Sequence, residues 1–156
     1  MKTSLLNRRE REHVSTTDDT LEANKAVVRR FWEAFSESRF DDALALLDPD
    51  ATWWVAGSTD ISGTYSKQQF GELVAGVAEG TEGGIRMTPK HMTAEGDRVA
   101  MEAESYGRMT NGKIYNNFYH LQHVLRDGKL VAIREYMDTQ HVQDVFGGDG
   151  NPDEEE

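Results

Sequence analysis

Two tight-turn signals in the second half of the chain constrain its fold more than any other feature. Asn111-Gly112 and Asp127-Gly128 are each flanked by segments that can alternate like β-strands. Asn-Gly and Asp-Gly favour two-residue hairpin loops because both positions tolerate positive φ. The sequence therefore predicts three consecutive antiparallel strands, at about residues 98–108, 114–126 and 129–140.

The turns also predict which residues face one another. A two-residue loop at Asp127-Gly128 pairs Arg126 with Lys129 and, counting outward, places His120 opposite Glu135. Side chains alternate between the two faces of a sheet with period two. One face is then apolar apart from a small polar group, and it comprises Val99, Met101, Ala103, Ser105, Phe118, His120, Gln122, Val124, Val131, Ile133, Glu135 and Met137.

Helices are expected before this sheet. Asp19 and Glu22 have the spacing of a capping box, and Val27, Val28, Phe31, Trp32 and Phe35 follow at helical intervals. A short helix from about residue 41, a strand at 51–56, a helix opened by Ser66 and Gln69 and ended by Gly80, and a strand near 85–95 complete the order. Helices first and an antiparallel meander last are typical of an α+β domain, with helices covering one face of a curved sheet.

Composition narrows the function classes. The 156 residues are enough for one domain, and the net charge of −11 argues against nonspecific nucleic-acid binding, which needs a basic surface. The absence of cysteine excludes disulfides and thiolate chemistry. No apolar run approaches the length of a membrane span. We expect a soluble cytoplasmic protein with a flexible arm at residues 1–18, a domain at 19–146 and a disordered acidic tail at 147–156.

Glu135 and His120 are the candidate catalytic pair. Directly opposed residues have Cβ atoms about 4.5–5.5 Å apart, within reach of a hydrogen bond. Burial raises the pKa of a carboxyl group and a protonated imidazole lowers it, so such a pair can exchange protons near neutral pH. The alternative is a buried polar pair that only stabilises the sheet. Gln122 is expected to orient a carbonyl or a water beside them.

Apolar side chains are expected to form the wall of a pocket around this group, although such a stripe is also typical of a plain core. The candidate substrate-binding residues are Trp53, Phe31, Val55, Tyr65, Met101, Ser105, Phe118 and Met137. No metal site is expected, because His120 and His123 point to opposite faces of a strand and no other ligand motif occurs. The opposite face of the sheet mixes tyrosine and leucine with charged residues, which predicts a homodimer interface there. Its residues include Tyr115, Tyr119, Leu121, His123, Leu125, Arg134 and Tyr136.

The segments ANKAVVRRFWEAFSESRFDDALALLDPDATWWV and GKIYNNFYHLQHVLRDGKLVAIREYMDT, with this element order, resemble the SnoaL-like branch of the NTF2-like superfamily. The resemblance covers about residues 21–142. It implies an α+β cone in which a curved antiparallel sheet wraps around three N-terminal helices and encloses a pocket, commonly in a dimer. The fold hosts cyclases, isomerases, hydrolases, dehydratases and binding modules, so the resemblance alone does not choose a function.

The site residues of the resembling enzymes are only partly present. Ketosteroid isomerases use an aspartate base, a tyrosine and a second acid, and these positions hold Val55, Phe31 and Gln122. In the Asp-Arg-Asp set of limonene-epoxide hydrolases, only the last-strand acid remains, as Glu135. Polyketide cyclases use a last-strand acid near polar side chains, which is most similar to Glu135 with His120 and Gln122, although an aspartate is usual there.

These observations predict a cofactor-independent enzyme of isomerase, cyclase or dehydratase type. Glu135 would move a proton on a hydrophobic carbonyl substrate, with His120 tuning it and Gln122 donating to the developing oxyanion. The alternative is a non-catalytic ligand-binding or accessory dimer module of the same fold.

Overall fold

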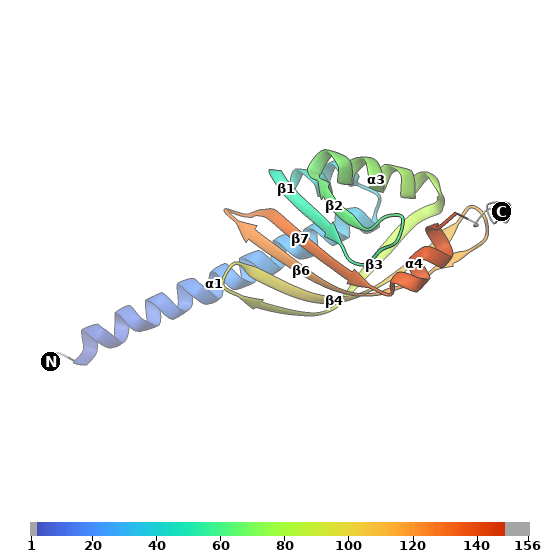
Figure 1. Ribbon diagram of the computed structural model, residues 1–156. Coiled ribbons are helices and arrows are strands. Elements are labelled where there is room, and N and C mark those ends of the chain that lie inside the picture. Colours follow the sequence, from blue (N-terminus) through green and yellow to red (C-terminus); the bar gives the residue numbers. More distant parts are fainter. Residues whose placement is uncertain (1–2, 149–156) are drawn as a thin grey trace.

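One curved sheet, with helices packed against it, makes up the body of the computed structural model (Figure 1), which describes residues 3–148, with side chains from residue 17 onward. The predicted α+β class is confirmed. In chain order the elements are α1 (Thr3–Ser36), α2 (Phe40–Ala45), β1 (Leu47–Val55), β2 (Gly63–Ser66), α3 (Lys67–Glu79), β3 (Thr81–Glu95), β4 (Arg98–Met109), β5 (Ile114–Tyr115), β6 (Phe118–Arg126), β7 (Lys129–Met137) and α4 (Thr139–Phe146).

The strands follow the order β2-β1-β7-β6-β4-β3, and β5 pairs with β4. All neighbours are antiparallel except β1 and β7, which run parallel. Helix α1 crosses behind the sheet and α3 lies along one side of it (Figure 1). The buried face of α1 presents Val28, Phe31 and Trp32, each at most 2% exposed, at the helical spacing that the sequence predicted. Among the described residues, no helix is long and apolar enough to cross a membrane.

Helix α1 is longer than predicted. It begins at Thr3, so residues 3–18, expected as a flexible arm, are helical, and the proposed start at Asp19 is wrong. Residues 3–36 contain neither glycine nor proline, so nothing in the chain interrupts the helix there. Of the acidic tail expected at 147–156, residues 149–156 lie outside the described residues.

The local signals of the middle segment are confirmed. Ser66 and Gln69 form the predicted capping box: Gln69 N donates to Ser66 Oγ over 3.2 Å, and Ser66 N donates to Gln69 Oε1 over 2.9 Å. Gly80 is the C-cap of α3. Strands β1 and β3 begin earlier than predicted, at Leu47 and Thr81.

The register of the two hairpins differs from the prediction by one residue each. In the first, Met109 N donates to Lys113 O over 2.8 Å, which makes a three-residue loop of residues 110–112 instead of a two-residue loop. In the second, Arg126 pairs with Lys129 as predicted, but a bulge follows and Val124 pairs with Ala132. A bulge inserts one extra residue into one strand and shifts every later pair.

The side chains of β6 therefore point the other way from the prediction. Tyr119, Leu121, His123 and Leu125 face the core, although they were assigned to the outer face. The physical reason is the hydrophobic pattern, since this set buries two leucines, and burial of one face outweighs the preferred loop length in setting register. On β4 and β7 the predicted faces are correct, with Met101 and Ile133 buried.

Strand β7 also ends earlier than predicted, at Met137, and α4 was not foreseen. Asp138 caps α4, because its side chain accepts from Gln140 N over 3.0 Å and from His141 N over 3.2 Å. The helix brings Phe146 against the ring of Tyr115, with the ring centroids 4.8 Å apart. Helix α4, which the sequence did not predict, thus closes one end of the core.

Candidate active site

A pocket opens between the sheet and helices α1, α3 and α4. Its cavity volume is about 80 Å³, several times the roughly 10–15 Å³ that one water needs. Its wall is apolar and aromatic, apart from one carboxyl group and two phenol hydroxyls. The lining residues are Trp32, Phe35, Trp53, Val55, Ile61, Phe70, Leu73, Val74, Val77, Ile85, Met87, Tyr115, Tyr119, Glu135 and Phe146.

Aromatic ring contacts build one wall of the pocket. The rings of Trp53 on β1 and Phe70 on α3 are stacked, with centroids 3.8 Å apart and planes 10° from parallel. Trp32 of α1 meets Trp53 edge-on, with centroids 5.7 Å apart. Because such side chains have few rotatable bonds and bury large areas, the wall is pre-formed rather than assembled around a ligand.

Glu135 is the only carboxylate among the described residues that line this pocket. It lies on β7, opposite Leu121 of β6 and beside Val55 of β1. The indole N–H of Trp53 donates to Glu135 Oε2 over 2.6 Å. Burial raises the pKa of Glu135 to about 7, and the Trp53 hydrogen bond opposes that rise. Both protonation states of this carboxyl group are therefore available near neutral pH.

The second oxygen of Glu135 faces the cavity. Within the described residues, Oε1 has no hydrogen-bond partner, because Trp53 bonds to Oε2 alone. Every fully buried polar side-chain atom in this part of the chain has a partner. Oε1 must therefore keep some contact with the open space of the pocket, where it can reach a bound molecule.

Two tyrosine hydroxyls lie in the same pocket. Tyr115 of β5 and Tyr119 of β6 are hydrogen-bonded to each other through their hydroxyl groups. Burial raises the pKa of Tyr115 to about 12 and raises that of Tyr119 well above its ordinary value; the charge of Glu135 raises both further. Both hydroxyls therefore stay protonated at neutral pH and act as hydrogen-bond donors.

A buried histidine below the pocket has a structural role. Trp32 Nε1 donates to His123 Nε2 over 3.0 Å, so His123 Nδ1 carries the proton and donates to the carbonyl of Val99 over 3.0 Å. Burial lowers the pKa of His123 to about 4, against the effect of the Val99 hydrogen bond. The imidazole is neutral and fully satisfied, and it ties α1 to β4 and β6.

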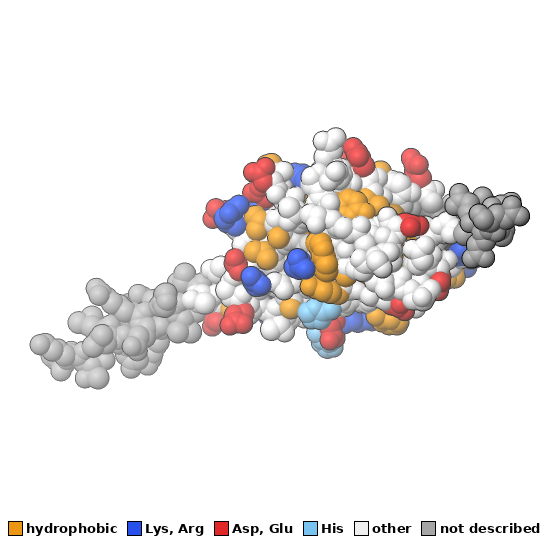
Figure 2. Space-filling view, in the orientation of Figure 1, with side chains coloured by type: hydrophobic (Ala, Val, Ile, Leu, Met, Phe, Trp, Pro, Cys, Tyr) orange, Lys and Arg blue, Asp and Glu red, His pale blue; other side chains and the backbone are white. Residues whose placement is uncertain are grey.

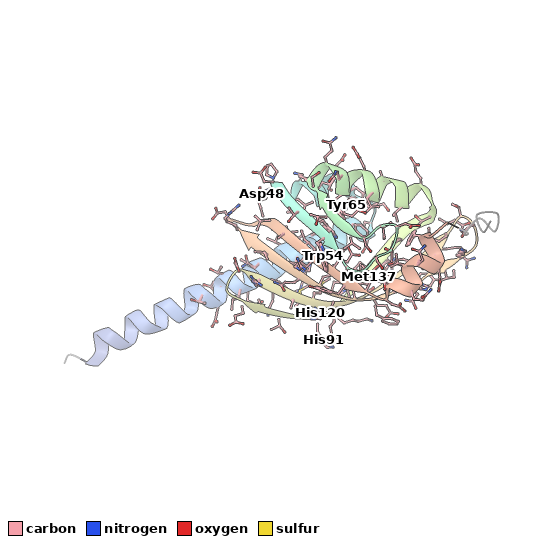
Figure 3. All side chains as sticks on the ribbon, in the orientation of Figure 1. Asp48, Trp54, Tyr65, His91, His120 and Met137 are labelled. Carbon is pink, nitrogen blue, oxygen red and sulfur yellow. The ribbon has the colours of Figure 1, made fainter. Side chains whose placement is uncertain are left out.

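Three predicted site residues lie outside the pocket. The one-residue change in register turns the side chains of His120, Gln122 and Phe118 away from the core. His120 pairs with Tyr136 of β7 instead of with Glu135. Phe118 is 64% exposed. Figure 3 labels His120 with Trp54 on the outer side of the sheet. The predicted pairing of His120 with Glu135 is therefore wrong, and so are the roles assigned to His120 and Gln122.

The other predicted residues divide into two groups. Trp53 and Val55 line the pocket beside Glu135, while Phe31, Met101 and Ser105 are buried behind its wall. Tyr65 and Met137 are half-buried and do not line it. The hydroxyl of Tyr65 donates to the carbonyl of Ile61 over 2.7 Å, and burial, followed by the charge of Glu135, raises its pKa.

Tyr115 and Tyr119 are the functional candidates that the sequence reasoning placed on the wrong face. The signal that could have found them is the alternation of β6, where Leu121 and Leu125 make their own face the apolar one. No group of three or more histidine, cysteine or acidic side chains among the described residues could hold a metal ion.

Comparison with known proteins agrees with this architecture. TerC, co-crystallized with polyporic acid, matches with a TM-score of 0.70 and 21% identity over 81% of this chain and 99% of its own. An NTF2-like protein of unknown function from Burkholderia pseudomallei matches with a TM-score of 0.71 and 19% identity, over 81% of this chain and 98% of its own. A protein of unknown function with a cystatin-like fold from Xanthomonas campestris matches with a TM-score of 0.70 and 23% identity, over 80% of this chain and 98% of its own.

At these identities the similarity establishes the fold. A search of curated proteins gave no match. The profile of the SnoaL-like domain matches residues 28–133, a range that contains all elements from α2 to β6 and most of the residues that line the pocket. With more than half of the chain matched, the protein belongs to the SnoaL-like domain family.

Proposed function

We propose that this protein is a cofactor-independent enzyme that moves a proton on a hydrophobic carbonyl compound, with Glu135 as both base and acid. The observation that carries the proposal is a single carboxyl group in an apolar pocket, with a pKa of about 7 and one oxygen toward the cavity. A general base works best when its pKa lies near the working pH. TerC, which shares the fold, was co-crystallized with polyporic acid, and this supports a small organic ligand.

The chemistry needs only this carboxylate. Glu135 takes a proton from the carbon next to a carbonyl group, the C–H bond breaks, and its electron pair moves onto the carbonyl oxygen to form an enolate. Return of the proton to another carbon completes an isomerisation. Attack of the enolate on a second carbonyl leaves an alkoxide, which takes the proton back from Glu135 and completes a cyclisation. Loss of hydroxide from the neighbouring carbon, which Glu135 protonates to water, completes a dehydration.

Hydrogen–deuterium exchange at the α-carbon tests this proposal without knowledge of the natural substrate. Apolar aryl ketones in D₂O are followed by proton NMR with the wild type and with Glu135→Gln. We expect catalysed exchange by the wild type and a loss of about 100-fold or more in the variant, because general bases contribute roughly 10²–10⁴-fold. Glu102→Gln, the same change at an exposed position on β4, is the matched control.

A loss of less than tenfold in Glu135→Gln, with its circular dichroism unchanged, would contradict the proposal. Binding of the ketones without any exchange would instead favour a ligand-binding module. That second function is favoured by the aromatic wall, since the stacked Trp53 and Phe70 suit a flat apolar ligand whether or not it reacts.

We also propose that the protein forms a homodimer through the outer face of the sheet. The β6 residues predicted for this face, Tyr119 and Leu121, are buried, whereas Arg134 and Tyr136 of β7 lie on it as predicted. Phe118 and Tyr136 are 64% and 42% exposed on this face. Figure 2 shows hydrophobic and positively charged side chains together there, where Arg134 lies 4.0 Å from the ring centroid of Trp54. Exposed aromatic and arginine side chains are enriched at protein interfaces.

A further inference from the structure

The hydroxyl pair of Tyr115 and Tyr119 has a role that its packing alone does not explain. Two phenol groups bring two protons into the pocket, and their mutual hydrogen bond uses only one of them. The other proton needs an acceptor. Both side chains line the cavity in which Oε1 of Glu135 is open, so that acceptor can be a bound molecule.

Asn117 sets the direction of hydrogen bonding toward this pair. Its Oδ1 accepts from Phe118 N over 2.7 Å and from Asp138 N over 3.1 Å, so the side-chain amide cannot be reversed. Its Nδ2 then donates to the carbonyl of Asp138 over 2.9 Å and to the hydroxyl oxygen of Tyr115 over 3.3 Å. A donor at this end polarises the pair and strengthens its outer hydroxyl as a donor.

Ser105 does not consume the spare proton. Its Oγ accepts from Asn117 N over 3.0 Å and lies 3.5 Å from the carbonyl oxygen of the same residue, to which it donates. Neither of these two hydrogen bonds involves a tyrosine hydroxyl, and the described hydrogen bonds of the pair join only the two hydroxyls and Asn117 Nδ2. The surplus proton of the pair is therefore available to a ligand in the cavity.

The pair also lies at a useful distance from Glu135. Tyr119 faces Met137 and Leu121 faces Glu135, so Tyr119 and Glu135 are diagonal neighbours on the inner face of β6 and β7. Diagonal neighbours have Cβ atoms about 7–8 Å apart or slightly less, which leaves room between two long side chains for a few ligand atoms. A carbonyl oxygen and its α-carbon are two such atoms, separated by one carbon.

We propose that the Tyr115–Tyr119 pair is the oxyanion site of this pocket and that the ligand is an apolar compound with an enolisable ketone or aldehyde, or its enol. The inference rests on the proposed function of Glu135. The ligand oxygen accepts the surplus hydroxyl proton in a hydrogen bond while its α-carbon faces the carboxylate. When Glu135 takes the α-proton, the electron pair released from the C–H bond is held as an enolate at the tyrosine pair.

Binding of 2-naphthol tests this assignment separately from catalysis. It is flat and apolar, its ionised oxygen mimics an enolate, and its fluorescence distinguishes the naphthol from the naphtholate. We use Glu135→Gln as the parent, because it removes the carboxylate charge that would repel the anion. Titrations at pH 7.5 then give both the affinity and the ionised fraction of the bound ligand.

We expect Tyr119→Phe in this parent to weaken naphtholate binding about 10-fold or more and to lower the ionised fraction, since hydrogen bonds to charged groups are stronger than those between neutral groups. Tyr115→Phe should give a smaller loss in the same direction, and it serves as the second variant if the first does not fold. Tyr106→Phe, the same change on an exposed side chain, is the control. A change that only loosened the fold would not alter the ionisation of the bound ligand.

Two results would overturn the inference: no binding of 2-naphthol to the parent up to millimolar concentration, or tyrosine variants that bind it as tightly and as ionised as the parent. Either can occur while ketone exchange still depends on Glu135, and the proposed function would then stand without this oxyanion site. The reverse result, tyrosine-dependent binding with exchange unaffected in Glu135→Gln, would support the anion site and contradict the role of Glu135 as base.

Discussion

Replacing Glu135 by glutamine is expected to make the protein more stable, relative to the wild type, as the pH rises. The pKa of Glu135 is raised from 4.5 to about 7 by burial, so between these values the folded protein holds a proton that the unfolded chain releases. The wild type therefore has the full benefit of the neutral carboxyl group below pH 4.5 and loses it as the pH rises through about 7. Glutamine does not titrate and has no such loss.

His123 acts in the opposite direction and must be separated from this effect. Its pKa is lowered from 6.5 to about 4, so the unfolded chain binds a proton that the folded protein does not, and stability falls as the pH drops through that window. The two slopes nearly cancel in the wild type between about pH 4.5 and 6.5. Both proteins contain His123, so the difference between their free energies of unfolding isolates Glu135.

With a pKa of 4.5 in the unfolded chain and about 7 in the folded protein, the variant should gain about 2 kcal/mol over the wild type between pH 5.5 and 8. Urea unfolding followed by circular dichroism at the two pH values measures this gain. Tryptophan fluorescence is unsuitable, because Trp53 bonds to the substituted group. Glu102→Gln, measured in parallel, is the exposed control. A gain below about 0.5 kcal/mol, or a loss, would refute the burial argument.

The remaining predictions concern the partner of Glu135 and the outer face. Trp53→Phe removes the hydrogen bond that lowers the pKa of Glu135. The pH midpoint of ketone exchange should therefore move upward by about one unit, since such a bond contributes about 1.5 kcal/mol or more. An unchanged midpoint would show that this bond does not tune the base. Light scattering at micromolar concentration should give twice the chain mass of 17.6 kDa, and Phe118→Asp should halve it without changing the circular dichroism; a monomeric wild type would contradict the dimer.

Local signals predicted the elements well, because the residues that decide them are close in the chain. Ser66 and Gln69 satisfy each other's backbone N–H groups three residues apart, and Asp127-Gly128 forms the turn that its φ preferences require. The start of α1 was missed because Asp19 and Glu22 have cap chemistry wherever they occur, and only a real interruption of the helix would make them its first turn.

Register was the part that local signals could not supply. Turn chemistry predicts the loop length, but the face that each strand buries depends on packing against helices that lie far away in the chain. His120 and Gln122 were assigned to the site from loop length alone. The leucines of β6 contain the contrary evidence, and the preference for burying Leu121 and Leu125 should have outweighed the two-residue loop.

The bulge on β7 is what gives the pocket its acid. After the Asp127-Gly128 turn, Leu125 pairs with Leu130, and both face the core. Strict alternation from Leu130 would turn Ala132, Arg134 and Tyr136 inward and leave Glu135 in solvent. An unpaired guanidinium among aromatic rings would be strongly unfavourable. The extra residue reverses the alternation, so Ile133 and Glu135 face the core, and Arg134 stacks on Trp54 outside. The sequence places Glu135 on the inner face correctly because it alternates there with Ile133 and Met137. The predicted pairing with His120 is wrong because it assumed that β6 and β7 pair without a bulge.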